Sequence, residues 1–286
     1  MGSQLNSEKT TAVSINDDGV TLRLKAPITL PVEAESICPD CFVGCQQSEI
    51  LALPVFCGRR RKMLGDIFSV SGEASDRITV EGDLTHFKRI GQGMSRGRLT
   101  LRGDGGMHIG AYMKGGEICV EGNTRDWTGA HMTGGMIRIR GNAGHFTGAA
   151  YPGEIRGVNR GTIIVHGDVG NETGARMRRG LIVVEGHTGE CTGAGMIAGS
   201  VFVFGKLGAR AGAGNKRGSI VALGETAPML PTYQYQCRAQ FGFLGVYLRQ
   251  IRKWGIAVSD DLLKGSFRRF SGDVTALNKG EILIHD

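Results

Sequence analysis

Short alternations of apolar and polar residues recur through the middle of the chain. In residues 117–135, Ile118 and Val120 alternate with Cys119 and Glu121, which is the period of a β-strand with one buried face. Each such strand ends at a glycine, and aliphatic residues stand four and two positions before that glycine in eight segments: Ile78/Val80, Leu99/Leu101, Ile118/Val120, Ile137/Ile139, Ile163/Val165, Ile182/Val184, Val201/Val203 and Ile220/Ala222. The pattern therefore predicts eight strands that bury equivalent faces.

The glycines that end these strands have a nearly fixed spacing. They are Gly82, Gly103, Gly122, Gly141, Gly167, Gly186, Gly205 and Gly224, with successive gaps of 21, 19, 19, 26, 19, 19 and 19 residues. A repeat of this length is typical of a solenoid, in which each coil buries its apolar face against the next. The longest gap contains a seven-residue insertion at 151–157, and insertions in solenoids often bulge from a binding face.

These features predict a mainly β fold whose centre, residues 75–225, is a parallel β-helix of about eight coils. The period also indicates the handedness. Left-handed hexapeptide helices carry an aliphatic residue at every sixth position, and neither that rhythm nor the Ca²⁺-binding nonapeptide is present in the sequence. A right-handed β-helix is therefore the predicted architecture.

Within one coil, a turn is predicted at Gly122, and residues 128–132 are predicted to form a second extended piece. Ala130 and Met132 of that piece are expected to point inward. Methionine recurs ten residues after the strand glycine in four coils, at Met113, Met132, Met177 and Met196. Repetition in register predicts an internal ladder of methionines and not a set of copper or substrate ligands.

The segments on either side of the repeats form small appendages. Residues 1–74 are predicted to hold one or two strands, a proline-bounded loop and a short helix around 49–53. Residues 226–286 are predicted to form a C-terminal helix and tail. The helix falls on FGFLGVYLRQIRKWG, and its apolar side is expected to carry Phe243, Val246, Tyr247 and Trp254.

The outward strand positions change character along the repeats. Early coils place mostly polar or charged residues there, whereas later coils place Phe202, Phe204, Val221 and Leu223. An aromatic and aliphatic patch open to water marks an interface. We therefore expect either the C-terminal helix or a sister subunit to cover these four residues.

Composition narrows the class of protein further. The 286 residues include 47 glycines and are 41% apolar, but no apolar run is long enough to cross a membrane. The start, MGSQLNSEKTT, is polar and lacks the apolar core of a signal peptide. The odd number of cysteines, seven, then indicates free thiols in a reducing cytoplasm. A net charge of +7 leaves nucleic acid, an acidic subunit and a polyanionic small molecule open as partners.

One group of cysteines has the spacing of a metal site. Cys38, Cys41 and Cys45 read C-x2-C-x3-C, as in zinc or iron–sulfur sites, but Pro39 occupies the first spacer and no paired fourth ligand follows. We expect small buried thiols here and no metal in this chain, while the metal alternative stays open.

The other titratable residues form no catalytic set in the sequence. His108, His131 and His145 fall at different positions of the coil, so surface and turn histidines are expected and not a ligand group. Aspartates that follow strand glycines are expected to cap their own backbone two residues on: Asp83, Asp104 and Asp168. The sequence shows no Ser-His-Asp set and no GxxxxGK[ST] loop, and we predict no catalytic residue in this chain.

Basic residues recur just before the coil-closing glycines. Stacking places these residues along one edge of the rod: Arg96, Arg160, Arg179 and Arg217, with Lys114, Arg178 and Lys216 beside them. A solvated basic rim that limits aggregation explains such a row. The other explanation is an acidic partner, and the residues alone do not decide between the two.

The order of motifs along nearly the whole chain resembles a known family. PVEAESICPDCFVG, EILALPV and LGDIF precede the TGAxM coils, as in the C subunit of formylmethanofuran dehydrogenase and in the gamma subunit of the formyltransferase/hydrolase complex of methylotrophic bacteria. The coils alone are also similar to the glycine-repeat domain of glutamate synthase, so the N-terminal motifs are what specify the resemblance.

This resemblance implies a cytoplasmic complex that moves a formyl group from formyl-tetrahydromethanopterin through a methanofuran-type carrier to formate. The active sites of such complexes lie on sister subunits, and the chain would be a non-catalytic scaffold without its own cofactor, bound to neither membrane nor nucleic acid. The polyglutamyl tail of the carrier is the acidic partner that Arg160, Arg178, Arg179 and Arg217 would meet. Two alternatives remain: the C subunit of a molybdenum or tungsten formylmethanofuran dehydrogenase, and a stand-alone β-helical enzyme.

Overall fold

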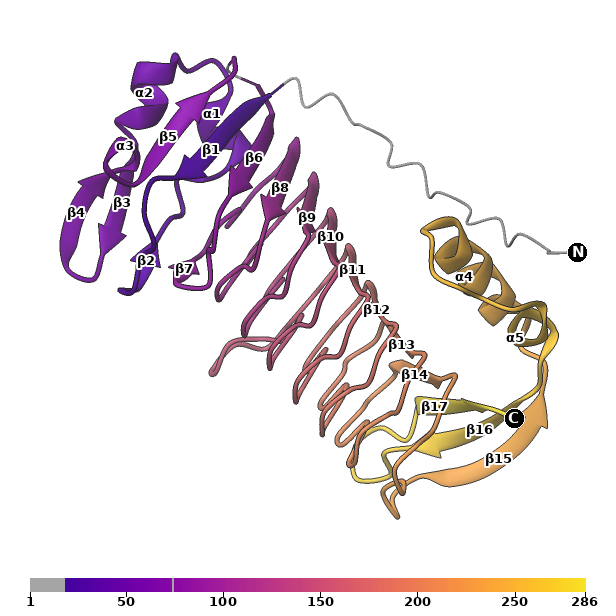
Figure 1. The fold of residues 1–286 in the computed structure, drawn as a ribbon. Helices are drawn as coiled ribbons and strands as arrows, with labels where there is room; N and C mark the ends of the chain where they lie inside the picture. The colour runs from indigo at the N-terminus through magenta and orange to yellow at the C-terminus, as the bar shows by residue number, and fades with distance from the viewer. Residues whose placement is uncertain (1–18, 74) are drawn as a thin grey trace, which may run out of the picture.

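The computed structural model describes residues 19–73 and 75–286, so the expectation about a signal peptide lies outside the described residues. In these two ranges the fold is mainly β, with one sheet of 13 strands, a second sheet of four strands and short helices near the two ends (Figure 1). Within the described ranges, no helix has the length and apolar character that crossing a bilayer requires.

Eight parallel strands form the middle of the large sheet and coincide with the eight predicted segments: β6 (Arg77–Glu81), β8 (Arg98–Arg102), β9 (Glu117–Val120), β10 (Met136–Ile139), β11 (Thr162–Val165), β12 (Leu181–Val184), β13 (Ser200–Val203) and β14 (Ser219–Ala222). The register joins equivalent positions of successive repeats, so that Ile118 pairs with Ile137 and Val120 with Ile139. Every one of the sixteen predicted inner aliphatic residues is at most 1% exposed. The arrangement is consistent with a β-helix-like fold.

The strand-ending glycines are needed because neighbouring coils approach each other closely. At Gly122, an added Cβ would lie 2.7 Å from the carbonyl oxygen of Gly103 in the preceding coil. A larger residue at this position would therefore push two coils apart, and the lack of a side chain matters here more than the freedom to adopt positive φ.

The predicted methionine ladder is confirmed. Its four members are fully buried, as is Ala130: Met113, Met132, Met177 and Met196. The methyl group of Met113 occupies space that a glycine of the next coil leaves open, because an added Cβ at Gly135 would lie 2.7 Å from Met113 Cε. Methionine therefore packs the interior against glycine.

The Thr-Gly-Ala phrase forms a turn, and the prediction of a second extended piece there is wrong. Trp127, Gly129 and His131 have φ values of 65°, 66° and 56°, in the left-handed region. Thr128 is fully buried, and its hydroxyl donates to the carbonyl of Arg125 at 3.1 Å. Three later threonines repeat the same bond: Thr147, Thr173 and Thr192. The phrase recurs because each coil needs one buried hydroxyl to close its turn.

Polar side chains after the strand glycines join one coil to the next. Asp104 Oδ1 accepts the backbone N–H of Asn123 at 2.7 Å, and Asp168 Oδ1 accepts that of His187 at 2.7 Å. The predicted cap two residues on is therefore wrong for these two aspartates. It is found at Asp83, whose carboxylate accepts the N–H two residues later at 3.0 Å.

The N-terminal flank continues the large sheet. β1 (Val20–Leu24) pairs in parallel with β6 and antiparallel with β5 (Phe68–Ser71). Beside it lie the small sheet and three short helices: β4 (Arg60–Met63), β3 (Pro54–Cys57), β2 (Val32–Glu33), β7 (Phe87–Lys88), α1 (Pro39–Phe42), α2 (Gln47–Leu51) and α3 (Leu64–Ile67). α2 is the predicted helix, shifted by two residues. The large sheet continues through both flanks and so does not test the predicted domain boundaries at residues 75 and 225. These boundaries stay a prediction.

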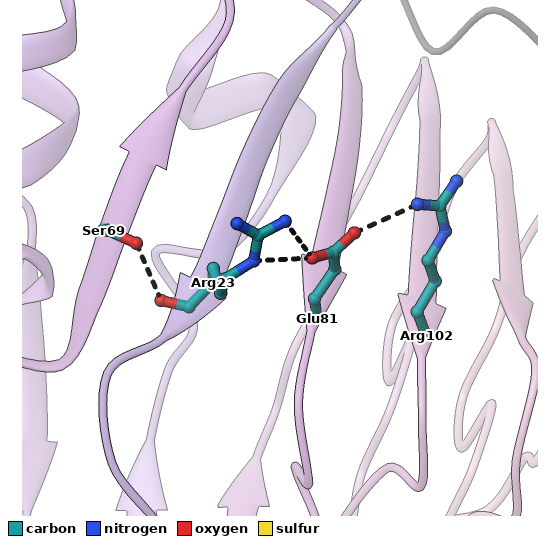
Figure 2. A network of polar contacts seen from close by, with 4 residues as sticks. All are labelled: Arg23, Ser69, Glu81 and Arg102. Atoms are coloured by element: carbon teal, nitrogen blue, oxygen red, sulfur yellow. Dashed lines mark hydrogen bonds and ion pairs between the residues drawn. The ribbon is translucent and has the colours of Figure 1, made fainter.

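A network of charged side chains ties the first strands of the large sheet together (Figure 2). Glu81 on β6 accepts from Arg23 Nε of β1 at 2.9 Å and from Arg102 Nη1 of β8 at 3.0 Å. Ser69 Oγ donates to the Arg23 carbonyl at 3.3 Å. The hydrogen bond from Arg23, and after it the one from Arg102, lowers the pKa of Glu81.

The C-terminal flank extends the other end of the sheet and adds a helix beside it (Figure 1). β17 joins β14 in parallel, and β16 and β15 follow antiparallel: β17 (Gly280–His285), β16 (Phe267–Gly272) and β15 (Gln234–Ala239). The predicted helix is α4 (Gly242–Lys253), followed by α5 (Asp260–Lys264). It buries Leu244, Leu248 and Ile251, so placing Phe243 and Val246 on its apolar side is wrong: they are 41% and 63% exposed.

Candidate functional site

The parallel register places the predicted basic residues in one row. Arg160, Arg179 and Arg217 each stand two residues before positions that pair along β11, β12, β13 and β14. Arg160 and Arg179 therefore lie on adjacent coils, about 4.8 Å apart along the ladder, and Arg217 lies two coils beyond. These three side chains are exposed and Arg178 is half-buried. What the row binds stays a prediction.

A cluster of aromatic side chains lies beside the insertion: His108, Tyr112, Trp127, His131, Phe146 and Tyr151. Trp127 stacks on Phe146 with ring centroids 4.3 Å apart, and Tyr112 stacks on His131 at 4.9 Å. Tyr151, the first residue of the insertion, is 4.9 Å from Trp127 and 5.0 Å from His131. Sequence reasoning missed this cluster, although a spacing of 19 residues joins all its members except Tyr151 and is visible in the sequence.

The polar atoms of the aromatic cluster are bound to one another. His108 Nδ1 lies 2.8 Å from the Tyr151 hydroxyl, and the Tyr151 backbone N–H donates to His131 Nε2 at 2.8 Å. Burial lowers the pKa of both histidines, and the positive charge of Arg89 lowers the pKa of His108 further. Burial also raises the pKa of Tyr151 to about 12. The cluster is therefore uncharged at neutral pH and offers ring surface and hydrogen bonds.

The insertion at 151–157 is bound to the next coil and leaves a hollow on each side. Arg176 Nη1 donates to the carbonyl of Glu154 at 2.7 Å. A hollow of about 370 Å³ lies between the insertion and the Tyr112–His131 stack. A second, of about 300 Å³, lies between the insertion and Arg176. The insertion therefore forms one wall of each of two concave surfaces.

The two hollows adjoin the basic row. Asn159, the neighbour of Arg160 in sequence, lines the first hollow, and Lys216, the neighbour of Arg217, lines the second. The aromatic cluster and the insertion thus adjoin the coil positions that carry the basic row, and we call these three features together the insertion face. Aromatic and arginine side chains are the residue types enriched where proteins contact partners.

The predicted apolar interface is covered by the chain itself. Phe202 and Val221 are fully buried against α4, and the Phe202 and Tyr247 ring centroids are 5.4 Å apart. Phe204 and Leu223 are half-buried at the edge of the same cluster. Of the two predicted covers, the C-terminal helix is the one present, and it leaves Phe202 and Val221 no surface for a sister subunit. Contact of a sister subunit with Phe204 and Leu223 stays a prediction.

The candidate metal ligands do not converge. Among residues 19–73 and 75–286, no three His, Cys, Asp or Glu side chains gather into a group that could hold a metal ion. The thiols of Cys38, Cys41 and Cys45 are free, but the expectation that all three are buried is wrong: Cys38 is buried, Cys41 is exposed and Cys45 is half-buried. Cys45 Sγ donates to the carbonyl of Cys41 at 3.3 Å. His145 is bonded to the backbone of the next coil, since its Nδ1 accepts the N–H of Asn171 at 2.9 Å.

Comparison with known proteins supports the motif order seen in the sequence. The model of the GXGXG motif family matches residues 79–236. The C subunit of tungsten-containing formylmethanofuran dehydrogenase 2 of Methanothermobacter wolfeii is 39% identical over 97 residues, which is 32% of this chain and 36% of that protein. The C subunit of the formyltransferase/hydrolase complex Fhc of Methylorubrum extorquens is 34% identical over 89 residues, which is 31% of this chain and 34% of that protein. The aligned stretch thus spans about a third of these curated relatives.

Comparison with solved structures covers more of the chain. A chain of the X-ray crystal structure of the formyltransferase/hydrolase complex (FhcABCD) from Methylorubrum extorquens in complex with methylofuran superposes with a TM-score of 0.85. The identity is 32%, and the superposition covers 92% of this chain and 98% of that chain. The likeness therefore includes the flanks as well as the repeats.

Proposed function

We propose a function from one premise: the chain belongs to the GXGXG motif family and, within it, to the family of formylmethanofuran dehydrogenase C subunits. We infer that it is a non-catalytic scaffold subunit of a formyltransferase/hydrolase complex in one-carbon metabolism. Such a complex moves a formyl group from formyl-tetrahydromethanopterin through a methanofuran-type carrier to formate.

One observation carries this proposal, namely the superposition on a chain of the FhcABCD complex. It extends over 98% of that chain, whereas a shared repeat alone would match only the coils. The mainly half-buried aromatic rings and the mainly exposed arginines of the insertion face fit the same role, because a scaffold must present contact surface to sister subunits.

A second candidate is the C subunit of a molybdenum or tungsten formylmethanofuran dehydrogenase. It is favoured by the identity of 39% to the tungsten protein, against 34% to the Fhc protein. Purifying the native protein and measuring co-migrating subunits and metals separates the candidates. Molybdenum or tungsten in stoichiometric amount supports the second candidate, and formyl transfer by a complex without either metal supports the first. Activity of the isolated chain would overturn both and favour a stand-alone β-helical enzyme.

We further propose that the stacked strands wind as a right-handed parallel β-helix over residues 75–225. The support is the parallel pairing of successive repeats in one sheet, since connections between parallel strands of one sheet are right-handed in about 98% of cases. An experimental structure of the chain tests the hand directly, and a left-handed path of the coils would overturn this part of the proposal.

The basic row is proposed to hold the acidic tail of the carrier loosely. A polyglutamyl tail carries one negative charge per residue, and Arg160, Arg178, Arg179 and Arg217 would meet it along the stacked coils. Exposed pairs of this kind contribute about 0.2–1 kcal/mol each, so several together slow the escape of a tail that no single pair traps. Screening over about 8 Å at physiological ionic strength makes the contact sensitive to salt.

The test is an Arg178→Glu/Arg179→Glu variant in the assembled complex, with Arg60→Glu/Arg61→Glu on β4 as a control of equal charge change. The proposal expects intact assembly and a raised KM for the long-tailed carrier, but little change for a truncated carrier or in the control. An equal effect on both carriers contradicts tail binding. Loss of assembly instead assigns these arginines to contact with a sister subunit.

A further inference from the structure

Two cysteines of the N-terminal flank share a single turn of backbone. Cys38 directly precedes α1 and Cys41 is the third residue of α1, where the Cys41 N–H donates to the Cys38 carbonyl at 2.9 Å. A turn of four residues brings its ends within about 7 Å between Cα atoms, and a disulfide needs about 4.4–6.8 Å. The backbone therefore already holds the pair at a separation that a disulfide can bridge.

The two thiols differ in exposure. Cys38 is 3% exposed within the apolar core of the flank, whereas Cys41 is open to solvent. The contact with Cys38 lowers the pKa of Cys41 to about 7, and the same contact, followed by burial, raises the pKa of Cys38 far above its usual range. An accessible thiolate beside a protected thiol is the arrangement that thiol–disulfide exchange requires.

The turn is also joined to the first coil beyond β6. Asp40, between the two cysteines, accepts the backbone N–H of Ser95 at 2.7 Å, and Arg96 lies 3.8 Å from the same carboxylate. The Cys38 thiol donates to Asp40 Oδ2 at 3.5 Å. A bond between the two sulfurs removes this donor, so the redox state of the pair acts on the contact between α1 and the segment that leads into β8.

We propose that Cys38 and Cys41 form a reversible redox-active dithiol whose reaction partner is a low-molecular-weight disulfide of the glutathione class. The Cys41 thiolate attacks one sulfur of the disulfide RSSR and releases RS⁻, which leaves a mixed disulfide on Cys41. Cys38 gives its proton to the Asp40 carboxylate, which passes it to solvent, and the Cys38 sulfur attacks Cys41 Sγ and releases the second RS⁻. Both thiolates take up protons, so two protein thiols and RSSR become one protein disulfide and two RSH, with two electrons passed to RSSR.

The test uses the full chain incubated with oxidised glutathione, followed by peptide mapping without reduction. The expected product is a Cys38–Cys41 disulfide that reduced glutathione reverses. Cys38→Ser is expected to stop at a glutathione adduct on Cys41, and Cys41→Ser, at an exposed position, is expected to leave Cys38 unmodified. Cys237→Ser removes an exposed thiol of β15 and serves as the matched control, with the Cys38–Cys41 product unchanged.

Alkylation kinetics give a second readout that does not depend on the variants. The alkylation rate at Cys41 is expected to rise with pH and to level off above about pH 7, where its thiol is ionised. The alkylation rate of an ordinary thiol continues to rise up to about pH 8.5. A disulfide from Cys41 to Cys45 would overturn the pairing. Glutathione adducts that never resolve in the unmodified chain, or equal oxidation of all exposed thiols, would overturn the proposal as a whole.

Discussion

The outer face of the large sheet has two halves of different chemistry, although its inner face is uniform. One register column runs through Thr79, Thr100, Cys119 and Arg138 in β6–β10, and then through Ile164, Val183, Phe202 and Val221 in β11–β14. The first half is crossed by side-chain bonds such as the Glu81 network of Figure 2, whereas α4 packs on the second half.

The difference shows what a repeat fixes and what it leaves free. Each coil must meet the next with the same inner side chains, so the inner column stays aliphatic from β6 to β14. The outer column faces either solvent or another segment of the chain, such as α4. Burying a large apolar side chain contributes about 1.5–3 kcal/mol, whereas an exposed ion pair contributes about 0.2–1 kcal/mol. The second half therefore depends on α4 far more than the first half depends on its charges.

The largest expected effect comes from Phe202→Ala on the covered half. Phe202 is fully buried between β13 and α4, so its truncation should leave a cavity and cost about 3–5 kcal/mol of unfolding free energy. The measurement is urea unfolding followed through Trp254, which packs against the same cluster. Thr100→Ala, in the same register column of the open half, is the control and should change stability by less than about 0.5 kcal/mol. Equal losses in the two variants would remove the distinction between the halves.

On the inner face the two halves should respond alike. Met132→Ala, in the coil before β10, and Met196→Ala, in the coil before β13, both truncate fully buried side chains. Each is expected to cost about 2–5 kcal/mol, since both leave cavities in the same type of interior. Urea unfolding of the two variants side by side checks this. A loss at one site that greatly exceeds the loss at the other would mean that the inner face is not uniform.

The sequence predicted the strands and their inner face well, because stacking requires the same residues at the same place in each coil. It did not predict the conformation of the Thr-Gly-Ala turn. Trp127 adopts positive φ, which is uncommon for residues with a Cβ, and its residue type gives no sign of it. The turn is imposed by the buried Thr128 hydroxyl and by bonds to the adjacent coils, which only the folded structure brings together.

The helix and the candidate site show the same limit. α4 was predicted in the correct place, but apolar residues lie on several of its sides, so the sequence did not specify that Leu244 and Leu248 would be buried while Phe243 would be exposed. The basic row was predicted from the 19-residue repeat of the coils. The aromatic cluster was not predicted, because it depends on how the insertion places Tyr151 against Tyr112 of one coil and Trp127 of the next.

A smaller effect is expected at the boundary between the halves. Arg138 Nη1 donates to the carbonyl of Trp254, the C-cap residue that follows α4, at 2.9 Å. Arg138→Ala should therefore cost about 1 kcal/mol, and the loss should be local to the end of the helix. Faster amide hydrogen exchange at Gly255 and Trp254 is the measurement, with the exposed Arg140→Ala as control. Unchanged exchange at both amides would show that the boundary residue does not hold the helix.

The smallest effect should appear in the open half, as a dependence on pH. The hydrogen bond from Arg23 first, and then that from Arg102, lowers the pKa of Glu81 in the folded chain. A lowered pKa means that the pair stabilises the fold above the unfolded-state pKa, near about 4.3, and that this stability is lost as the pH falls through the folded value.

Glu81→Gln should thus lose no more than about 1 kcal/mol at pH 7, because both arginines are largely exposed at 70% and 44%. The difference between the unmodified chain and the variant should shrink toward zero as the pH falls below about 4, and it should shrink at pH 7 in high salt. Urea midpoints measured from pH 7 to pH 3 decide the matter. A difference that persists unchanged at pH 3 would mean that Glu81 acts through packing and not through its charge, and the two halves would then differ less than their side chains indicate.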